Sequence, residues 1–149
     1  MSETTRGEIC IASEGDIVMA RKLVRNVATA LGFGITDVAR IVTASSELNR
    51  NSYRYAGTGV MRWQSLTRDA ELGLELTFED NGPGIPDVAK AMERGFSTSK
   101  GLGLGLPGAK RLMDEMTIRS QIGKGTTVQV RKWLRKQNDA NAAERGSSP

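Results

Sequence analysis

Glu47 and Asn51 are the first residues of this sequence whose types and spacing could serve chemistry. They lie four positions apart in the stretch ELNRN, inside a segment with the apolar spacing of a helix, so their side chains share one side of it. A carboxylate and an amide offer the oxygen ligands that Mg²⁺ prefers. A solvated polar helix face would have the same pattern, and the spacing alone leaves both interpretations open.

The stretch DNGPG, residues 80–84, is a second candidate because it directly follows a strand-like segment. A carboxylate at Asp80 could accept a hydrogen bond from an exocyclic amine in a cavity. Gly82 and Gly84 would let the backbone approach a planar ligand closely or adopt positive φ. Asn-Gly and Pro-Gly also form tight turns well, so a turn without a ligand is the alternative.

The glycine-rich stretch KGLGLGLPG, residues 100–108, is the third candidate. Read from Gly103, it matches the dinucleotide fingerprint G-x-G-x-x-G, but polar, turn-like residues precede it where that fingerprint needs a hydrophobic strand. We therefore exclude a Rossmann site. Gly101, Gly103 and Gly105 would instead expose successive backbone N–H groups ahead of a helix N-terminus, which suits phosphate. A flexible connector is the alternative.

The segments around these motifs predict one α+β domain over residues 1–135. Asp16 and Thr36 are expected to cap two helices, a short helix is expected over 87–94, and a further helix is expected to begin near Pro107. The strands are expected at 8–12, 59–66, 72–80, 117–122 and 125–134, the last two joined by a glycine turn within residues 123–126. Helices and strands are segregated, which predicts a mixed, mostly antiparallel sheet with the helices on one face. Residues 136–149 are polar and predict a disordered tail.

Composition narrows the function classes. The chain has 149 residues, of which 38% are hydrophobic, and no apolar run approaches the roughly 18 residues of a membrane span. It has no histidine, so histidine acid–base chemistry and an intrinsic phosphohistidine are excluded. The net charge of +4 is scattered, without a basic block, which argues against direct nucleic-acid binding. The single Cys10 and the start MSETTRGE, which does not look like a signal peptide, favour a cytoplasmic protein.

The order of the motifs is more specific than any one of them. Glu-x-x-x-Asn on a helix, Asp-x-Gly-x-Gly after a strand, Gly-x-Gly-x-Gly before a helix and Gly-x-Gly-Thr before a strand resemble the N, G1, G2 and G3 boxes of the GHKL ATPases. The resemblance spans residues 9–134 and implies a Bergerat-type two-layer α/β sandwich that binds ATP and Mg²⁺.

Longer stretches of the sequence make this resemblance more specific. GDIVMARKLVRNVATALGF, ELNRNSYRYAGTG and GKGTTVQVRKWLR are similar to the RsbT-type switch kinases, small protein serine/threonine kinases of bacterial stress signalling. That family implies phosphorylation of a STAS-domain scaffold or antagonist protein, followed by release and activation of a PP2C-type phosphatase. It implies neither a nucleic acid nor a membrane as partner.

The resemblance also implies a role for each matching residue. Glu47 would be the general base, Asn51 a ligand of Mg²⁺, and Asp80 the acceptor of the adenine amino group. The remaining nucleotide contacts would come from the glycine boxes and their neighbours: Gly82, Gly84, Lys100, Gly101, Gly103, Gly105 and Thr126.

Two other functions remain as alternatives to a Ser/Thr kinase. One is a non-catalytic, nucleotide-dependent binding module of the anti-sigma type, and the other is a detached histidine-kinase catalytic domain acting on a partner. The first helix, near Arg21 and Arg25, and the loop after it are expected to contribute to partner docking because they lie directly ahead of the Glu47 helix.

Overall fold

The computed structural model describes residues 5–85, 92 and 105–134. The elements within them are β1 (Arg6–Ile11), α1 (Glu14–Leu31), α2 (Ile35–Ala56), β2 (Gly59–Arg68), β3 (Glu71–Asp80), α4 (Gly105–Leu112), β4 (Glu115–Gln121) and β5 (Gly125–Leu134). Each expected element within the described residues is present, although α4 begins at Gly105, two residues before Pro107. The helix expected over 87–94, apart from Met92, and the polar tail lie outside the described residues.

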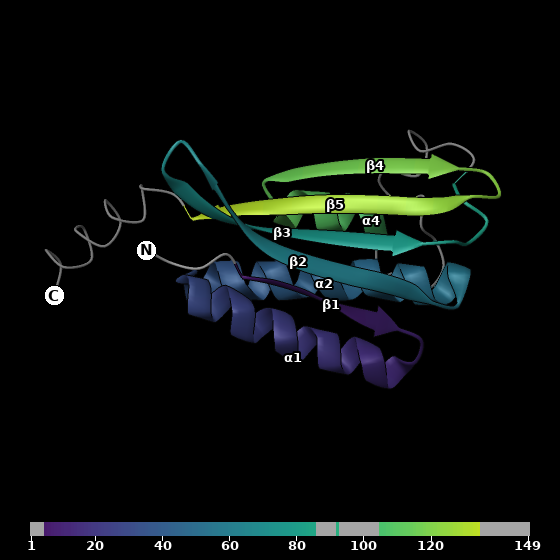
Figure 1. Cartoon of the computed structure of the whole chain (residues 1–149), viewed down its shortest axis with the longest axis horizontal. Helices are drawn as coiled ribbons and strands as arrows, with labels where there is room; N and C mark the ends of the chain where they lie inside the picture. Colours follow the sequence, from purple (N-terminus) through teal and green to yellow (C-terminus); the bar gives the residue numbers. More distant parts are fainter. Residues whose placement is uncertain (1–4, 86–91, 93–104, 135–149) are drawn as a thin grey trace, which may run out of the picture.

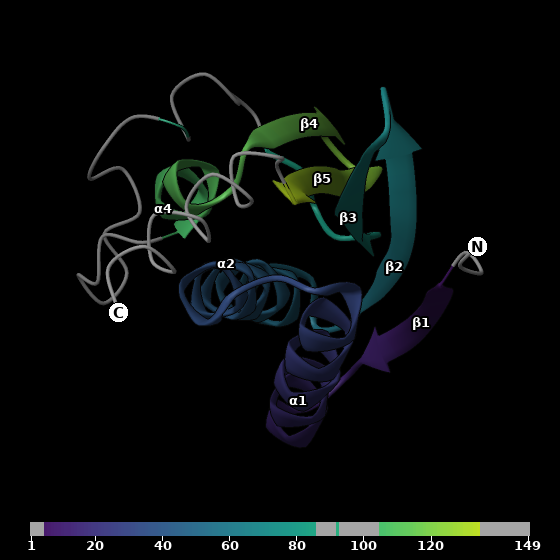
Figure 2. The same ribbon diagram turned by 90° about the vertical axis from the view of Figure 1, so that its left-hand side faces the viewer.

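The five strands form one sheet in the order β1-β2-β3-β5-β4, and every pairing among them is antiparallel. The parallel component of a mixed sheet is therefore not found in the part of the chain that the structure describes. The helices lie on one face of the sheet (Figures 1 and 2). This is the α+β two-layer arrangement expected from the sequence.

Strand β3 lies at the centre of the sheet and sets its two faces. Leu74, Leu76 and Phe78 are buried toward the helices, as the alternation of the sequence predicts. Helix α1 contributes Ile17, Ala20 and other small or branched residues at helical spacing to the same core. None of the described helices is long and apolar enough to cross a membrane.

The N-caps of both long helices differ from the prediction. Ser13 caps α1, because its hydroxyl accepts the N–H of Asp16 at 3.1 Å, while the Asp16 carboxylate accepts the N–H of Ala12 at 2.9 Å. Asp16 is therefore the reciprocal partner of the cap rather than the cap itself. Helix α2 begins one residue before Thr36, at Ile35, and its N-cap Gly34 makes no side-chain bond.

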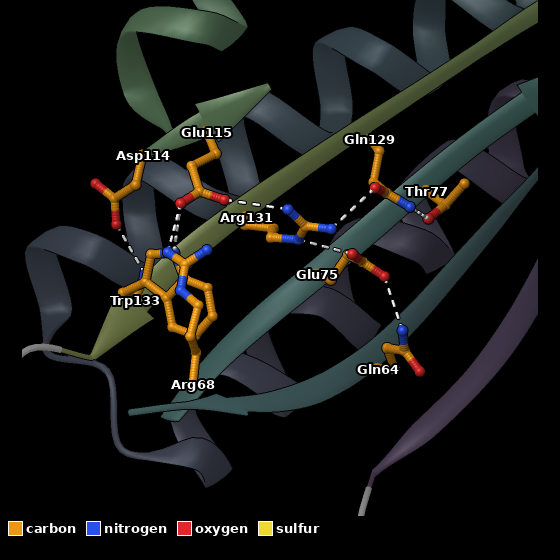
Figure 3. A network of polar contacts seen from close by, with 9 residues as sticks. All are labelled: Gln64, Arg68, Glu75, Thr77, Asp114, Glu115, Gln129, Arg131 and Trp133. Carbon is orange, nitrogen blue, oxygen red and sulfur yellow. Dashed lines mark hydrogen bonds and ion pairs between the residues drawn. The ribbon is translucent and has the colours of Figure 1, made fainter. Parts of the chain in front are cut away.

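The opposite face of the sheet carries a network of polar side chains (Figure 3). At its centre, Glu75 is only 6% exposed and accepts hydrogen bonds from Arg131 and Gln64, both at 2.8 Å. Its carboxylate raises the pKa of Arg131, whereas Arg68 and then Arg131 lower the pKa of Glu115. Alternation predicts a solvent-facing Glu75, but the cross-strand partners bury it. The charged side chains at the centre of this face therefore pair with one another.

Lys132 links α4 to the sheet. It points to the helix-covered face, is 6% exposed, and its ammonium group donates to the carbonyl of Leu112 at 2.8 Å. A cation at that position satisfies a free carbonyl at the C-terminus of α4 and favours the negative end of the helix dipole. In Figure 1, α4 runs into β4 at one end of the sheet, so the start of α4 is directed toward the opposite end, where β3 ends.

Candidate active site

Asp80, Thr126 and Ser120 lie side by side at one end of the sheet. Asp80 pairs with Thr126 across β3 and β5, and Thr126 pairs with Ser120 across β5 and β4. Directly paired residues project to the same face, as do residues two positions apart on a strand. Because Phe78 and Val128 are buried beneath the helices, these three polar side chains also point to the helix-covered face.

The loop after β3 is held against the β4–β5 turn. Asp80 Oδ1 accepts the N–H of Gly82 at 2.9 Å, and the carbonyl of Pro83 accepts the N–H of Gly123 at 2.8 Å. Gly84 has φ +82°, and a Cβ there would lie 2.3 Å from the carbonyl oxygen of Gln121. Gly84 is thus required by backbone packing, whatever it does toward a ligand.

The same loop also contacts the C-terminal end of α2. A Cβ on Gly82, in this loop, would lie 2.6 Å from the Cβ of Ala56. The start of β2 packs on the same end of the helix, since a Cβ on Gly59 would lie 2.8 Å from the Cβ of Ser52. Figure 1 shows the end of α2, the end of β3 and the β4–β5 turn at the same end of the molecule. The fold therefore brings Asp80 and Thr126 close to the helix segment that carries Asn51.

Glu47 and Asn51 lie on a flank of α2, and both are partly buried. The neighbouring Ser46 faces α1, since its hydroxyl accepts from Nε of Arg21 at 3.4 Å. At 3.6 residues per turn, Asn51 lies about 140° around the helix from Ser46, and is directed away from α1. Figure 2 shows α1 and α4 on different sides of α2, with the sheet curving from β4 at the top to β1 at the lower right.

Arg50 holds one oxygen of Glu47. The distance from Arg50 Nη1 to Glu47 Oε2 is 2.9 Å, and the Glu47 side chain is 14% exposed. The pair engages Oε2, so Oε1 is the Glu47 oxygen that Arg50 leaves open to another contact. The sequence analysis did not single out Arg50, although its spacing of three from Glu47 on a helix is a recognisable signal.

The glycine-rich segment is only partly described. Gly105 opens α4 with φ +38° and is buried. Lys100, Gly101 and Gly103 lie outside the described residues, so their phosphate contacts remain predictions.

Ser120 is the second residue that the sequence analysis did not single out, because its importance depends on the register of β4 against β5.

The donor set suits magnesium better than a metal that needs a protein cage. Among the described residues, no group of three or more Asp, Glu, His or Cys side chains could hold a metal ion. Mg²⁺ keeps several waters and is commonly held by one or two protein oxygens together with substrate phosphates. The amide oxygen of Asn51 fits such a site.

Comparison with known proteins decides the family. Residues 36–136 match the family described as histidine kinase-, DNA gyrase B-, and HSP90-like ATPase. The chain is 58% identical over 125 residues to the serine/threonine-protein kinase RsbT of Bacillus subtilis, covering 84% of this chain and 94% of that protein. The chain belongs to the RsbT-type protein serine/threonine kinases. As a member of this ATPase family, it binds ATP.

More distant relatives agree with this assignment. The anti-sigma F factor of Caldanaerobacter subterraneus is 33% identical over 121 residues, covering 77% of this chain and 83% of that protein. A crystal structure of RsbU and RsbW domains from Mycobacterium tuberculosis has a TM-score of 0.60 at 20% identity, with 86% of this chain matching 32% of that one. At 20% identity, the similarity to this crystal structure supports the fold alone.

Gly125 offers a test of how tightly the site is built. It has φ +98°, and a Cβ there would lie 2.0 Å from the carbonyl oxygen of Asp80. We expect Gly125→Ala to lower the free energy of unfolding by more than about 2 kcal/mol, because the methyl group must displace the backbone of β3. Urea denaturation measures this change.

Gly123→Ala is the matched control. Gly123 also has positive φ, +81°, but a Cβ there would meet nothing within 4 Å. Only the cost of about 1 kcal/mol for the left-handed conformation is expected. Equal losses in the two variants would contradict the close packing of the β4–β5 turn on Asp80.

Proposed function

We propose that this chain transfers the γ-phosphoryl group of ATP to a serine or threonine hydroxyl of a STAS-domain scaffold or antagonist protein. The observation that carries the proposal is the placement of Asp80 beside Thr126 on the helix-covered face, next to the end of the helix that bears Glu47 and Asn51. This placement supports a site in which the end that reads the base and the end that reacts would lie on one side of the sheet.

The adenine end would be formed by Asp80 and Thr126. Asp80 Oδ1 is bound to the N–H of Gly82, which among the described residues leaves Oδ2 available to accept from an exocyclic amine. A carboxylate oxygen makes a stronger hydrogen bond than a neutral acceptor, and that bond would orient the base. Thr126 would assist at the same edge of the base.

The phosphate end would be formed by Asn51 and the glycine-rich segment. Asn51 would hold Mg²⁺, which would supply positive charge to offset the charge that develops on the phosphates. Backbone N–H groups at Gly101, Gly103 and Gly105, with the side chain of Lys100, would contact the phosphates. The N-terminal end of α4 is directed toward the end of the sheet where β3 ends, and its helix dipole would favour negative charge there.

Glu47 would act on the incoming hydroxyl. As the hydroxyl oxygen forms a bond to the γ-phosphorus, its proton passes to Glu47 Oε1. The bond from the γ-phosphorus to the bridging oxygen breaks, and ADP leaves with the electron pair. Arg50 would keep Oε2 engaged throughout, so that one oxygen faces the proton. Positioning and charge neutralisation supply most of the catalytic effect in such reactions.

A switch follows if the phosphorylated partner releases the kinase. We propose that the released chain activates a PP2C-type phosphatase or another downstream effector, as the resemblance to RsbT-type kinases implies. The direct test is incubation with radiolabelled ATP and a candidate STAS-domain protein, followed by mapping of the labelled residue. Acid-stable label on Ser or Thr supports the proposal, acid-labile label indicates a histidine target, and no label indicates a binding module.

Helix α1 is the proposed docking surface for these partners. Val18 and Met19 are 40% and 56% exposed, and the cationic Lys22 and Arg25 are exposed beside them. Arg21 is partly buried and bonded to Ser46, so it would connect a docked partner to the helix that carries Glu47.

We expect Arg21→Ala with Arg25→Ala to weaken partner binding by about tenfold or more, because truncated interface arginines commonly cost over 1 kcal/mol. Isothermal titration against the STAS partner measures the change. Arg40→Ala is the matched control, since Arg40 forms an exposed ion pair with Asp37 elsewhere on α2. Equal affinity of the double variant and the control would rule out docking on this surface.

A further inference from the structure

Ser120 lies at the centre of three hydrogen-bonding contacts within the proposed nucleotide site. Its Oγ accepts the N–H of Ile85 at 2.7 Å, lies 3.1 Å from the carbonyl oxygen of Gly125, and lies 2.8 Å from Oγ1 of Thr126. Ile85 belongs to the loop after β3, and Gly125 and Thr126 are the first two residues of β5. One hydroxyl thus joins the loop after β3 to the first two residues of β5.

Counting protons decides the direction of each bond. A serine hydroxyl carries one proton and two lone pairs. The N–H of Ile85 can only donate, and the carbonyl of Gly125 can only accept, so the Ser120 proton goes to Gly125. The contact with Thr126 is then satisfied only if the Thr126 hydroxyl donates to Ser120. This is the arrangement that satisfies all three contacts at once.

This arrangement controls what Thr126 presents to a ligand. With its own proton bound to Ser120, Thr126 Oγ1 has only lone pairs left, and it lies beside the carboxylate of Asp80 on the same face. Two adjacent acceptors attract an amino group, or a water that donates to both, and disfavour a carbonyl oxygen. A site whose polar groups match the ligand discriminates strongly against an analogue that leaves them unpaired.

We infer that Ser120 is a positioning residue that holds Thr126 as a hydrogen-bond acceptor and so sharpens the preference for an amino group over a carbonyl at carbon 6 of the purine. The inference rests on the proposed function, because it assumes that the base binds at Asp80. Without Ser120, the Thr126 hydroxyl is free to turn and donate to a carbonyl.

The test compares the affinities of the whole chain for ATP and for inosine triphosphate, which has a carbonyl at carbon 6. We expect Ser120→Ala to reduce the ratio of the two affinities by roughly five- to tenfold, the effect of one hydrogen bond. Ser120→Thr should restore the ratio. Ser65→Ala is the matched control, since Ser65 lies on β2 away from Asp80 and its hydroxyl accepts the backbone N–H of Thr5. An equal loss of affinity for both nucleotides in Ser120→Ala would overturn the inference.

A second variant shows whether Ser120 acts through Thr126. Thr126→Val removes the hydroxyl at nearly constant volume and should lower the same ratio. Adding Ser120→Ala to Thr126→Val should then change the ratio no further. Additive effects would overturn the inference. If thermal melts show that Ser120→Ala unfolds, Ser120→Cys carries the same expectation, because a thiol is a weak hydrogen-bonding group of similar shape.

The two hypotheses fail in distinguishable ways. A wild-type chain that binds the two nucleotides equally would contradict the assignment of Asp80 and with it the proposed function. A wild-type chain that prefers ATP, with an unchanged ratio in Ser120→Ala, would contradict the role of Ser120 alone.

Discussion

Replacing Glu47 with Gln is expected to abolish phosphoryl transfer while ATP still binds. The amide cannot take a proton from the attacking hydroxyl, and loss of a general base typically lowers the rate by about 10²- to 10⁴-fold. Glu47 would contact the reacting hydroxyl and not the base, so ATP affinity should stay within about threefold of wild type. Initial rates with labelled ATP and the STAS partner, together with nucleotide titrations, measure the two effects separately.

The fold should tolerate this change. The pair between Glu47 and Arg50 joins residues three apart on one helix, and such pairs contribute only about 0.3–0.5 kcal/mol. Glu8→Gln is the matched control, because Glu8 is exposed on the polar face of the sheet and pairs with Arg62. A Glu47→Gln variant that labels its partner at the control's rate would show that another group accepts the proton.

The reciprocal experiment is Asp80→Asn, which should impair binding of ATP itself. Hydrogen bonds to charged groups contribute about 1.5–3 kcal/mol, so ATP affinity should fall about 10- to 100-fold. This loss of ATP affinity follows from the hydrogen bond that Gly82 donates to the side chain at position 80. Its N–H holds the oxygen of the side chain at 2.9 Å, so the amide nitrogen of Asn would take the position that faces the ligand. A donor would then replace an acceptor.

Because a donor would replace an acceptor in Asp80→Asn, we expect a change in nucleotide preference as well as a loss of affinity for ATP. Inosine triphosphate, with a carbonyl at carbon 6, should lose much less affinity than ATP or should gain affinity in Asp80→Asn. Asp69→Asn is the matched control, since Asp69 has φ +53° in the β2–β3 turn, a conformation that Asn also adopts readily. If both nucleotides lose affinity equally in Asp80→Asn while its melting temperature is unchanged, Asp80 does not read the base.

Much of this architecture could be predicted from local patterns. The alternation in β3 identified Leu74, Leu76 and Phe78 as core residues, and the apolar spacing of α1 identified Ile17, Ala20 and Val24. Such patterns are reliable because a side chain's direction within one element depends only on its position along that element. The N-caps of α1 and α2 are Ser13 and Gly34 and not the predicted Asp16 and Thr36, so local rules alone do not fix the residue at which a helix begins.

Contacts between distant segments could not be predicted in this way. Alternation places Glu75 toward solvent, yet Arg131 and Gln64 lie over it and it is buried. Ser120 gains its three contacts only because the β4–β5 turn sets the pairing of Ser120 with Thr126. A shift of one residue in that register would turn Ser120, on the edge strand β4, to the other face of the sheet.

The sequence by itself determined the order of four short motifs, the helix side shared by Glu47 and Asn51, and the strand that ends at Asp80. These depend on spacing within single elements. Only the tertiary structure decided that Asp80, Thr126 and Ser120 form one row, that the loop after β3 packs on the end of α2, and that Arg50 engages one oxygen of Glu47. Register, packing and side-chain pairing depend on residues far apart in the chain, and only the folded chain brings these together.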